Sequence, residues 1–296
     1  MNRTRQSYIY ALLAIFFWST IPTTFKLGLE EIDILPMLAI ASVASTIALL
    51  IILLMQGKLH LVRATTRRDI LNSAMLGFLN PFLYYVILLN AYKLLPAQVA
   101  QPLNMIWPII LVFLSVPILG QKIGIKSFVA LFISFAGVFV ISTQGKILNP
   151  GQSDIKGVIF ATGSSVFWAL YFIFNVRDKR DEAVKLFVNF LFGSAYLIAA
   201  LVITGSWPEH LGLKGSIASV YVGFFEMGIT FYFWLKALQL AVTTDKVSNL
   251  VYLGPFLSLV FVHFILHEPV YYTTPAGLLL IISGILFQNI NNKTRQ

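Results

Sequence analysis

The sequence predicts an all-α integral membrane protein with ten transmembrane helices, arranged as two inverted five-helix repeats around a central cavity. Hydrophobic residues make up 58% of the chain and charged residues 11%, and the mean hydropathy is +0.82. Soluble domains carry about 25% charged residues, so the surface of this protein must face lipid. The second half also repeats the first after an odd number of apolar stretches, which turns the second copy over in the bilayer.

Matching residues at a constant spacing reveal the repeat. Gly77-Phe78 returns 146 residues later as Gly223-Phe224, and Gly137 returns 147 residues later as Gly284. At the same spacing of 147, Trp107-Pro108 returns as Gly254-Pro255. The predicted organisation is a first repeat over 1–143, a connector over 144–155 and a second repeat over 156–296.

Each predicted span is an apolar run near the roughly 20 residues that a membrane helix needs. The spans of the first repeat are 8–28, 34–56, 70–91, 97–119 and 125–143. Those of the second are 156–176, 184–204, 215–240, 245–267 and 273–291. Short connectors rich in Gly, Pro or charge separate them, and none is long enough to hold a soluble domain.

The distribution of basic residues predicts the orientation. With a cytoplasmic N-terminus, 5 of the 21 Lys and Arg residues fall outside and the other 16 inside, as the positive-inside rule requires. The five are Lys26, Lys93, Lys146, Lys156 and Lys214. Both termini are then cytoplasmic. The formal charge of +9 reports this topology and predicts no nucleic-acid partner. Cysteine is absent, which excludes disulfides and thiolate chemistry.

Glu226 is the strongest single candidate for a functional residue because it lies near the middle of a predicted span. A carboxyl at that depth is costly and typically marks a transport pathway or a proton relay. In the repeat Glu226 aligns with Asn80, and Thr230 aligns with Tyr84, so both halves place polar groups on one helix face with Gly223 or Gly77. The alternative is a structural carboxyl that is protonated and hydrogen-bonded to another helix.

Two further spans combine amides, aromatic rings and proline. Span 97–119 carries Asn104, Trp107 and Pro108, and its repeat partner carries Asn249, Tyr252 and Pro255. Proline frees a backbone carbonyl, which membrane helices tolerate where neighbours or a cavity satisfy it. The pair predicts a cavity for a zwitterionic or aromatic solute. The alternative is that the amides join helices and the prolines only kink them.

Three aromatic residues lie deep in the first and sixth spans. Trp18 and Trp168 are too deep for the interfacial belt that tryptophan usually occupies, and Tyr171 follows Trp168 by one helical turn. We expect them either to pack between the repeats or to form a surface on which a solute stacks. His263 and His267 have a metal-ligand spacing, but nothing nearby completes a site, so no metal and no cofactor are predicted.

These residues resemble the drug/metabolite transporter superfamily, in its EamA-type branch. The resemblance rests on Phe17-Trp18-Ser19-Thr20, on Pro108 to Gly120-Gln121-Lys122, on Pro255 to His267-Glu268-Pro269, and on Gly137 and Gly284. Asn104 to Pro108 is similar to the aromatic amino acid exporters, and this likeness implies that Tyr84, Asn104, Trp107, Trp168 and Tyr252 surround the solute. The family's acid after span four is replaced by Gln121, whereas Glu268 keeps it in the second copy.

We therefore expect a secondary transporter that exports an amino acid or related zwitterion across the inner membrane by alternating access. Its partners would be a small-molecule solute, the lipid bilayer and protons as a coupling ion; the oligomeric state is left open. The nearest alternative is an uptake carrier for a nucleotide-like compound or a drug. A membrane enzyme is a remote alternative, since no catalytic cluster is completed in the sequence. A non-transporting scaffold is equally remote, since it would not need the matched polar faces. No ATP-binding motif is found in the sequence, so transport would be passive or ion-coupled.

Overall fold

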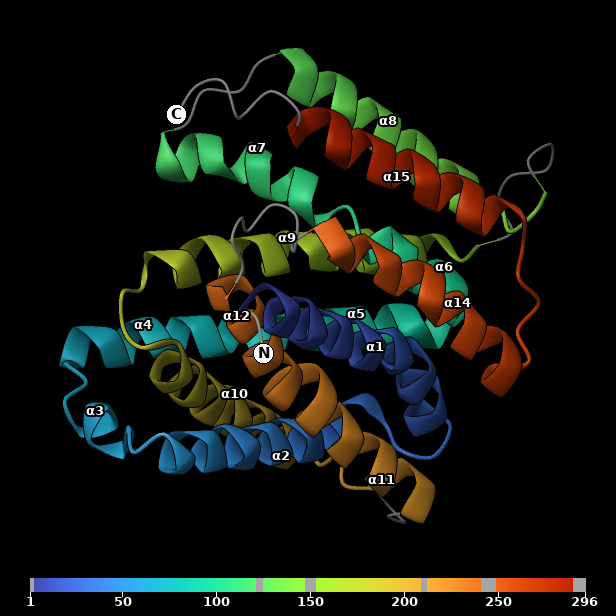
Figure 1. Ribbon diagram of the computed structural model, residues 1–296. Coiled ribbons are helices and arrows are strands. Elements are labelled where there is room, and N and C mark those ends of the chain that lie inside the picture. The colour runs from blue at the N-terminus through green and yellow to red at the C-terminus, as the bar shows by residue number, and fades with distance from the viewer. Residues whose placement is uncertain (1–2, 121–124, 147–152, 209–211, 241–248, 290–296) are drawn as a thin grey trace. The chain divides into compact units, whose positions relative to one another are not determined.

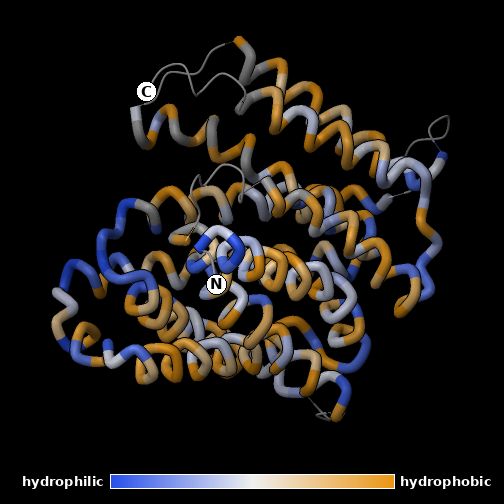
Figure 2. The backbone as a smooth tube through the Cα atoms, in the orientation of Figure 1, coloured by the Kyte–Doolittle hydropathy of each residue, from blue (hydrophilic) through white to orange (hydrophobic). Residues whose placement is uncertain are grey.

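Helices are the only regular secondary structure in the described part of the chain (Figure 1). The computed structural model describes residues 3–120, 125–146, 153–208, 212–240 and 249–289, and no strand occurs in these ranges. Seven helices are long and apolar enough to cross a membrane, and three shorter apolar helices accompany them. Figure 2 shows hydrophobic residues along most helices and hydrophilic residues at many of the connections. The predicted all-helical membrane fold is confirmed, and the count of ten spans stays a prediction.

The longer helices lie within or close to the predicted spans, whereas the short helix α3 lies in the predicted connector between the second and third spans. The first half contains α1 (Arg3–Leu29), α2 (Ile34–Met55), α3 (Leu59–Arg63), α4 (Arg67–Gly77), η1 (Phe78–Leu83), α5 (Tyr84–Leu94), α6 (Ala97–Asn104), α7 (Trp107–Leu119) and α8 (Ile125–Ser142). The second contains α9 (Ile155–Arg177), α10 (Glu182–Thr204), α11 (Leu213–Val222), η2 (Gly223–Gly228), α12 (Ile229–Leu240), η3 (Asn249–Tyr252), α14 (Leu253–Leu266) and α15 (Thr273–Asn289).

Local sequence explains where several helices begin and break. Thr66 and Asp69 form a reciprocal capping box at the start of α4, and the Asp181 carboxylate accepts a hydrogen bond from the Ala183 amide at the start of α10. Pro81 lies inside the irregular segment η1, and Pro108 follows the interruption between α6 and α7. Pro22, by contrast, is accommodated within the uninterrupted α1.

The chain divides into two compact units, each of which contains segments from both halves of the sequence. The first unit comprises Met1–Val86 and Asp178–Leu266, and the second comprises Ile87–Arg177 and His267–Gln296. In the first, α2 packs against α10, and α1 packs against α11, α12 and α14. In the second, α8 packs against α15, and α9 packs against α6 and α7.

Small residues bring the helices of the first unit close together. A methyl group added to Gly77 would collide with the Asn189 carbonyl of α10, and one added to Gly223 would collide with the Ala41 carbonyl of α2. Asn189 lies 148 residues after Ala41, so Gly77 and its repeat partner Gly223 make corresponding contacts. Thr46 and Ser194, also 148 residues apart, share a hydroxyl hydrogen bond of 3.0 Å.

The same correspondence appears in the second unit between α8 and α15. A Cβ atom on Gly137 would lie 2.5 Å from the Gly277 carbonyl oxygen, and one on Gly284 would lie 2.8 Å from the Ala130 carbonyl oxygen. The two contacts are related by the 147-residue shift of the sequence repeat. Glycine at these positions lets the two helix backbones approach closely, as is typical of helix pairs in membranes.

Candidate functional site

A kinked segment, η1, and a π-helical segment, η2, interrupt the third and eighth predicted spans at matching positions. η1 contains Asn80 and η2 contains Glu226, the pair that the sequence repeat aligns. A π-helical turn widens the helix by one residue and frequently marks a functional site. At Asn80 the backbone leaves helical geometry, with φ −151° and ψ 122°, whereas η2 continues directly into α12. The two halves are therefore irregular at the same depth but differ in detail.

Glu226 accepts hydrogen bonds from Tyr85 and Trp18 of the first unit. Its side chain is only half-buried, and the Tyr85 hydroxyl donates a hydrogen bond of 2.9 Å to Oε1. The Trp18 indole Nε1 donates to the Glu226 backbone carbonyl at 3.4 Å, so α1 contacts the π-helical segment directly. Among the described residues, no lysine, arginine or histidine forms an ion pair with Glu226.

The irregular backbone of η1 changes which residue of the predicted helix face contacts Glu226. Tyr84 is buried, with its ring against Tyr85 at 4.7 Å between centroids, and it is Tyr85 that contacts Glu226. The kink at Asn80 breaks the regular helical spacing, so residues after it do not keep the face that the sequence pattern predicts, and Tyr85 takes the place expected of Tyr84. Thr230 is fully buried and donates to the Phe225 carbonyl at 2.5 Å, so its hydroxyl supports the backbone of η2.

Aromatic rings enclose the segment that carries Glu226. Phe225 stacks on Phe17 with 4.4 Å between centroids, and Tyr221 lies 4.7 Å from Phe225. About two turns further along, in α12, Trp234 lies 5.5 Å from Trp18. The carboxyl is thus held by a helix whose adjacent residues are largely aromatic, a setting that favours positively charged or aromatic ligands.

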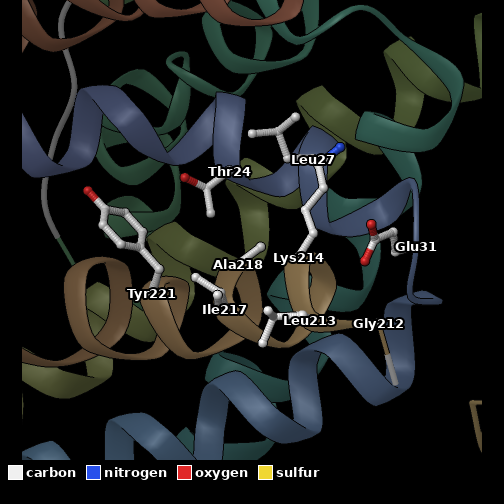
Figure 3. A pocket seen from close by; sticks show the side chains of 9 residues that line it. All are labelled: Thr24, Leu27, Glu31, Gly212, Leu213, Lys214, Ile217, Ala218 and Tyr221. Atoms are coloured by element: carbon white, nitrogen blue, oxygen red, sulfur yellow. The ribbon is translucent and has the colours of Figure 1, made fainter. Parts of the chain in front are cut away.

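A cavity of about 870 Å³ lies between the end of α1 and the start of α11 (Figure 3). Glu31 and Gly212 lie toward one end and Tyr221 toward the other, with apolar side chains such as Ile217 between them. Beyond this cavity the Tyr221 hydroxyl shares a hydrogen bond of 2.9 Å with Thr20. Tyr221 therefore connects the cavity wall to the aromatic rings around Glu226.

The second unit brings together four other predicted residues. The Asn104 amide donates to the Ser164 hydroxyl at 2.7 Å, which joins α6 to α9. Trp107 lies 6.4 Å from Trp168, and Trp168 lies 6.0 Å from Tyr171, measured between ring centroids. The predicted cluster of an amide and aromatic rings thus exists, although the Asn104 amide is engaged by another helix.

The structure shows fewer contacts for the remaining predicted residues. Asn249 and Tyr252 belong to η3, and their side chains lie outside the described residues. Asn80 is fully buried, and its amide has no hydrogen-bond partner among the described residues. Because the predicted residues divide between the two units, the central cavity that would combine them stays a prediction.

The structure also explains the acid that follows the ninth predicted span. The two oxygens of Glu268 accept hydrogen bonds from the Ala97 and Gln98 amides, at 3.1 and 3.4 Å, at the start of α6. A carboxylate at a helix N-terminus is stabilised by the helix dipole. Its repeat partner Gln121 lies outside the described residues. His263 packs against the ring of Phe264, and no metal-ligand cluster occurs among the described residues.

An ion-pair network that the sequence did not predict joins α4 to the loop before α10. Asp178 binds Arg180 at 2.5 Å, and Arg180 also donates to the Ser73 hydroxyl at 2.6 Å. Burial by itself raises the pKa of Asp178, but the hydrogen bonds and positive charge of Arg180 outweigh it and lower the pKa below its ordinary value. Nearby, Lys58 pairs with Asp181 at 2.7 Å.

Comparison with known proteins identifies the family. The family model of the EamA-like transporters matches residues 5–143 and 155–290, which together cover most of the chain. The chain belongs to the EamA-like transporter family. Its membership agrees with the apolar helices, and the protein is a multi-pass membrane transporter. The resemblance to the superfamily seen in the sequence is confirmed, whereas the likeness to aromatic amino acid exporters stays a prediction.

Relatives of this EamA-like transporter extend over its full length. The uncharacterized transporter YvbV of Bacillus subtilis is 27% identical and is matched over 100% of this chain and 95% of its own length. An uncharacterized transporter of Clostridium kluyveri is 25% identical, over 98% of this chain and 94% of its own. One crystal structure, at 18% identity, covers 98% of this chain and 99% of its own with a TM-score of 0.68, which supports the fold alone.

Proposed function

We propose that this EamA-like transporter exports an amino acid or a related zwitterion across the inner membrane by alternating access, with both termini cytoplasmic. The observation that carries the proposal is the half-buried Glu226 carboxyl in a π-helical segment of a membrane-length helix, bound by Tyr85 and enclosed by aromatic residues. Glu226 would hold the solute's amine or couple export to proton entry.

The corresponding contacts of the two sequence halves support a mechanism based on inverted repeats. Repeat-related residues meet at Thr46 and Ser194, and the contact between Gly137 and Gly277 has a counterpart between Gly284 and Ala130. We therefore propose that the repeats 1–143 and 156–296, joined by 144–155, exchange two related conformations and so open the pathway to either side. Transport by such a carrier requires no catalytic group, so we do not propose an enzyme.

Transport by purified protein in proteoliposomes tests the proposal. A panel of radiolabelled amino acids is loaded on one side, with and without a pH gradient, for the wild type and for Glu226→Gln. We expect the substitution to abolish transport or its response to the gradient. The matched control is Asp69→Asn, because Asp69 lies in the exposed capping box at the start of α4 and does not line the cavity between α1 and α11. An unchanged rate and an unchanged pH response in Glu226→Gln would contradict the proposed role.

A further inference from the structure

The Glu226 carboxylate offers one oxygen to a ligand. Oε1 accepts the hydrogen bond from Tyr85, whereas Oε2 has no hydrogen-bond partner among the described residues. The side chain also keeps part of its surface accessible, unlike the neighbouring Met227 and Gly228, which are buried. A negatively charged oxygen that is accessible but unpaired attracts a cation or a hydrogen-bond donor.

Three other acidic residues of the same unit are neutralised by basic partners within the protein. Asp178 pairs with Arg180, Asp181 with Lys58, and Glu182 with Lys185 at 2.8 Å. These pairs lie at the ends of helices, where the loops carry the charges. Glu226 differs because it lies within a membrane-length helix and has no cationic partner in the described part of the chain. If the Glu226 carboxylate is ionised, a cation other than these lysine and arginine side chains must balance its charge.

The aromatic surroundings specify what kind of cation fits. Trp18 contacts the π-helical segment through its indole nitrogen, and its ring lies 5.8 Å from Phe231 and 5.5 Å from Trp234. Aromatic faces attract ammonium groups and pack against apolar or aromatic bodies, whereas a strongly hydrated metal ion gains little from them. A ligand that combines an amine with an aromatic body matches both parts of the site.

We propose that the Glu226 site recognises its solute through a protonated amine on an aromatic or apolar body and requires no carboxylate on that solute. This inference rests on the proposed transport function and specifies the chemistry by which its site selects a solute. A carboxylate on the solute would meet the like charge of Glu226, and Lys214, the lysine that lines the cavity between α1 and α11, is already paired with Glu30 at 2.7 Å. Monoamines then bind at least as well as the corresponding amino acids.

The cavity between α1 and α11 has room for such a molecule. Its volume of about 870 Å³ lies within the usual range of about 300–1,000 Å³ for small-molecule pockets. Tyr221 lines it and contacts Phe225, the residue next to Glu226, while the bond between Tyr221 and Thr20 links the two helices. An aromatic amine in the cavity would therefore contact Tyr221, whose ring packs against Phe225 beside Glu226.

Three ligands with the same phenyl group separate the contributions of amine and carboxylate. Phenethylamine carries only the amine, phenylalanine carries both groups, and 3-phenylpropionate carries only the carboxylate. Binding is measured on purified protein in detergent by the shift of the unfolding temperature over a concentration series up to millimolar ligand. We expect phenethylamine to bind at least as tightly as phenylalanine, and 3-phenylpropionate to bind at least tenfold more weakly.

Variants connect the selectivity to the carboxylate. We expect Glu226→Gln to weaken phenethylamine binding at least tenfold, Glu226→Asp to retain much of it, and the control Asp69→Asn to leave it unchanged. Circular dichroism of each variant establishes that it is folded. Equal binding of 3-phenylpropionate and phenethylamine, undiminished binding by folded Glu226→Gln, or no binding of any of the three ligands would each overturn the proposal.

The outcome is distinguishable from a failure of the proposed function. Amino acid transport that persists without amine selectivity refutes this inference and leaves the transport proposal in place. Amine binding that depends on Glu226, without transport of any amino acid, supports this inference and refutes the proposed export.

Discussion

Replacing Gly137 with alanine tests the close packing of α8 against α15. The new methyl group would lie 2.5 Å from the Gly277 carbonyl oxygen and 2.8 Å from Cγ1 of Ile281, although ordinary contact begins near 3.4 Å. The backbones must therefore separate by almost an ångström at this point, because a backbone oxygen has no rotamer by which to move away. Such overpacking costs about 1–3 kcal/mol, and we expect a loss of about 2 kcal/mol in the free energy of unfolding.

The measurement is equilibrium unfolding in mixed detergent micelles, followed by circular dichroism. Gly163→Ala is the matched control, because Gly163 lies in helix α9 and an added Cβ would meet no atom within 4 Å. We expect this control to change the free energy of unfolding by no more than about 0.5 kcal/mol. If both variants unfold like the wild type, α8 and α15 do not approach as closely as described, and the reasoning is refuted.

Other contacts of the first unit give further expectations. Asp178→Asn leaves the Arg180 guanidinium without its partner in a poorly exposed site, and unfolding should become easier by about 3–5 kcal/mol. Because the pKa of Asp178 is lowered in the folded protein, its contribution to stability is present above about pH 4 and is lost as the pH falls through the lowered pKa. Unfolding measured over a series of acidic pH values should show this loss in the wild type but not in Asp178→Asn. Thr46→Ala removes the hydrogen bond to Ser194 and should cost about 0.6 kcal/mol in the same unfolding assay, and a loss above about 2 kcal/mol would indicate a different role.

The sequence predicted the helical class and the positions of the helices because both depend on local composition. An apolar run long enough to span a bilayer has few alternatives to a helix, since its backbone must satisfy its own hydrogen bonds. Pro108 likewise pointed to the interruption between α6 and α7. The position of η2 was not predicted, because Gly223 to Gly228 contains no proline and a π-helical turn leaves no distinct pattern in the sequence.

The candidate site was predicted in part. Glu226 and Trp18 were singled out because a carboxyl and an indole are unusual at mid-span, and the structure brings them into contact. Tyr85 was missed because regular helical spacing placed Tyr84 on the polar face, and the kink at Asn80 breaks that spacing. Thr20 and its partner Tyr221 were missed as a pair because they are 201 residues apart, and no local pattern reports such a contact.

The central claim is that Glu226 lies on the transport pathway of this EamA-like carrier. The most direct measurement is the counterflow of radiolabelled phenylalanine in proteoliposomes that contain the wild type, Glu226→Gln or the surface control Asp69→Asn. The account predicts accumulation of label with the wild type and the control and at least a tenfold lower rate with Glu226→Gln. Equal accumulation by all three proteins would show that the carboxyl is structural and would contradict the account.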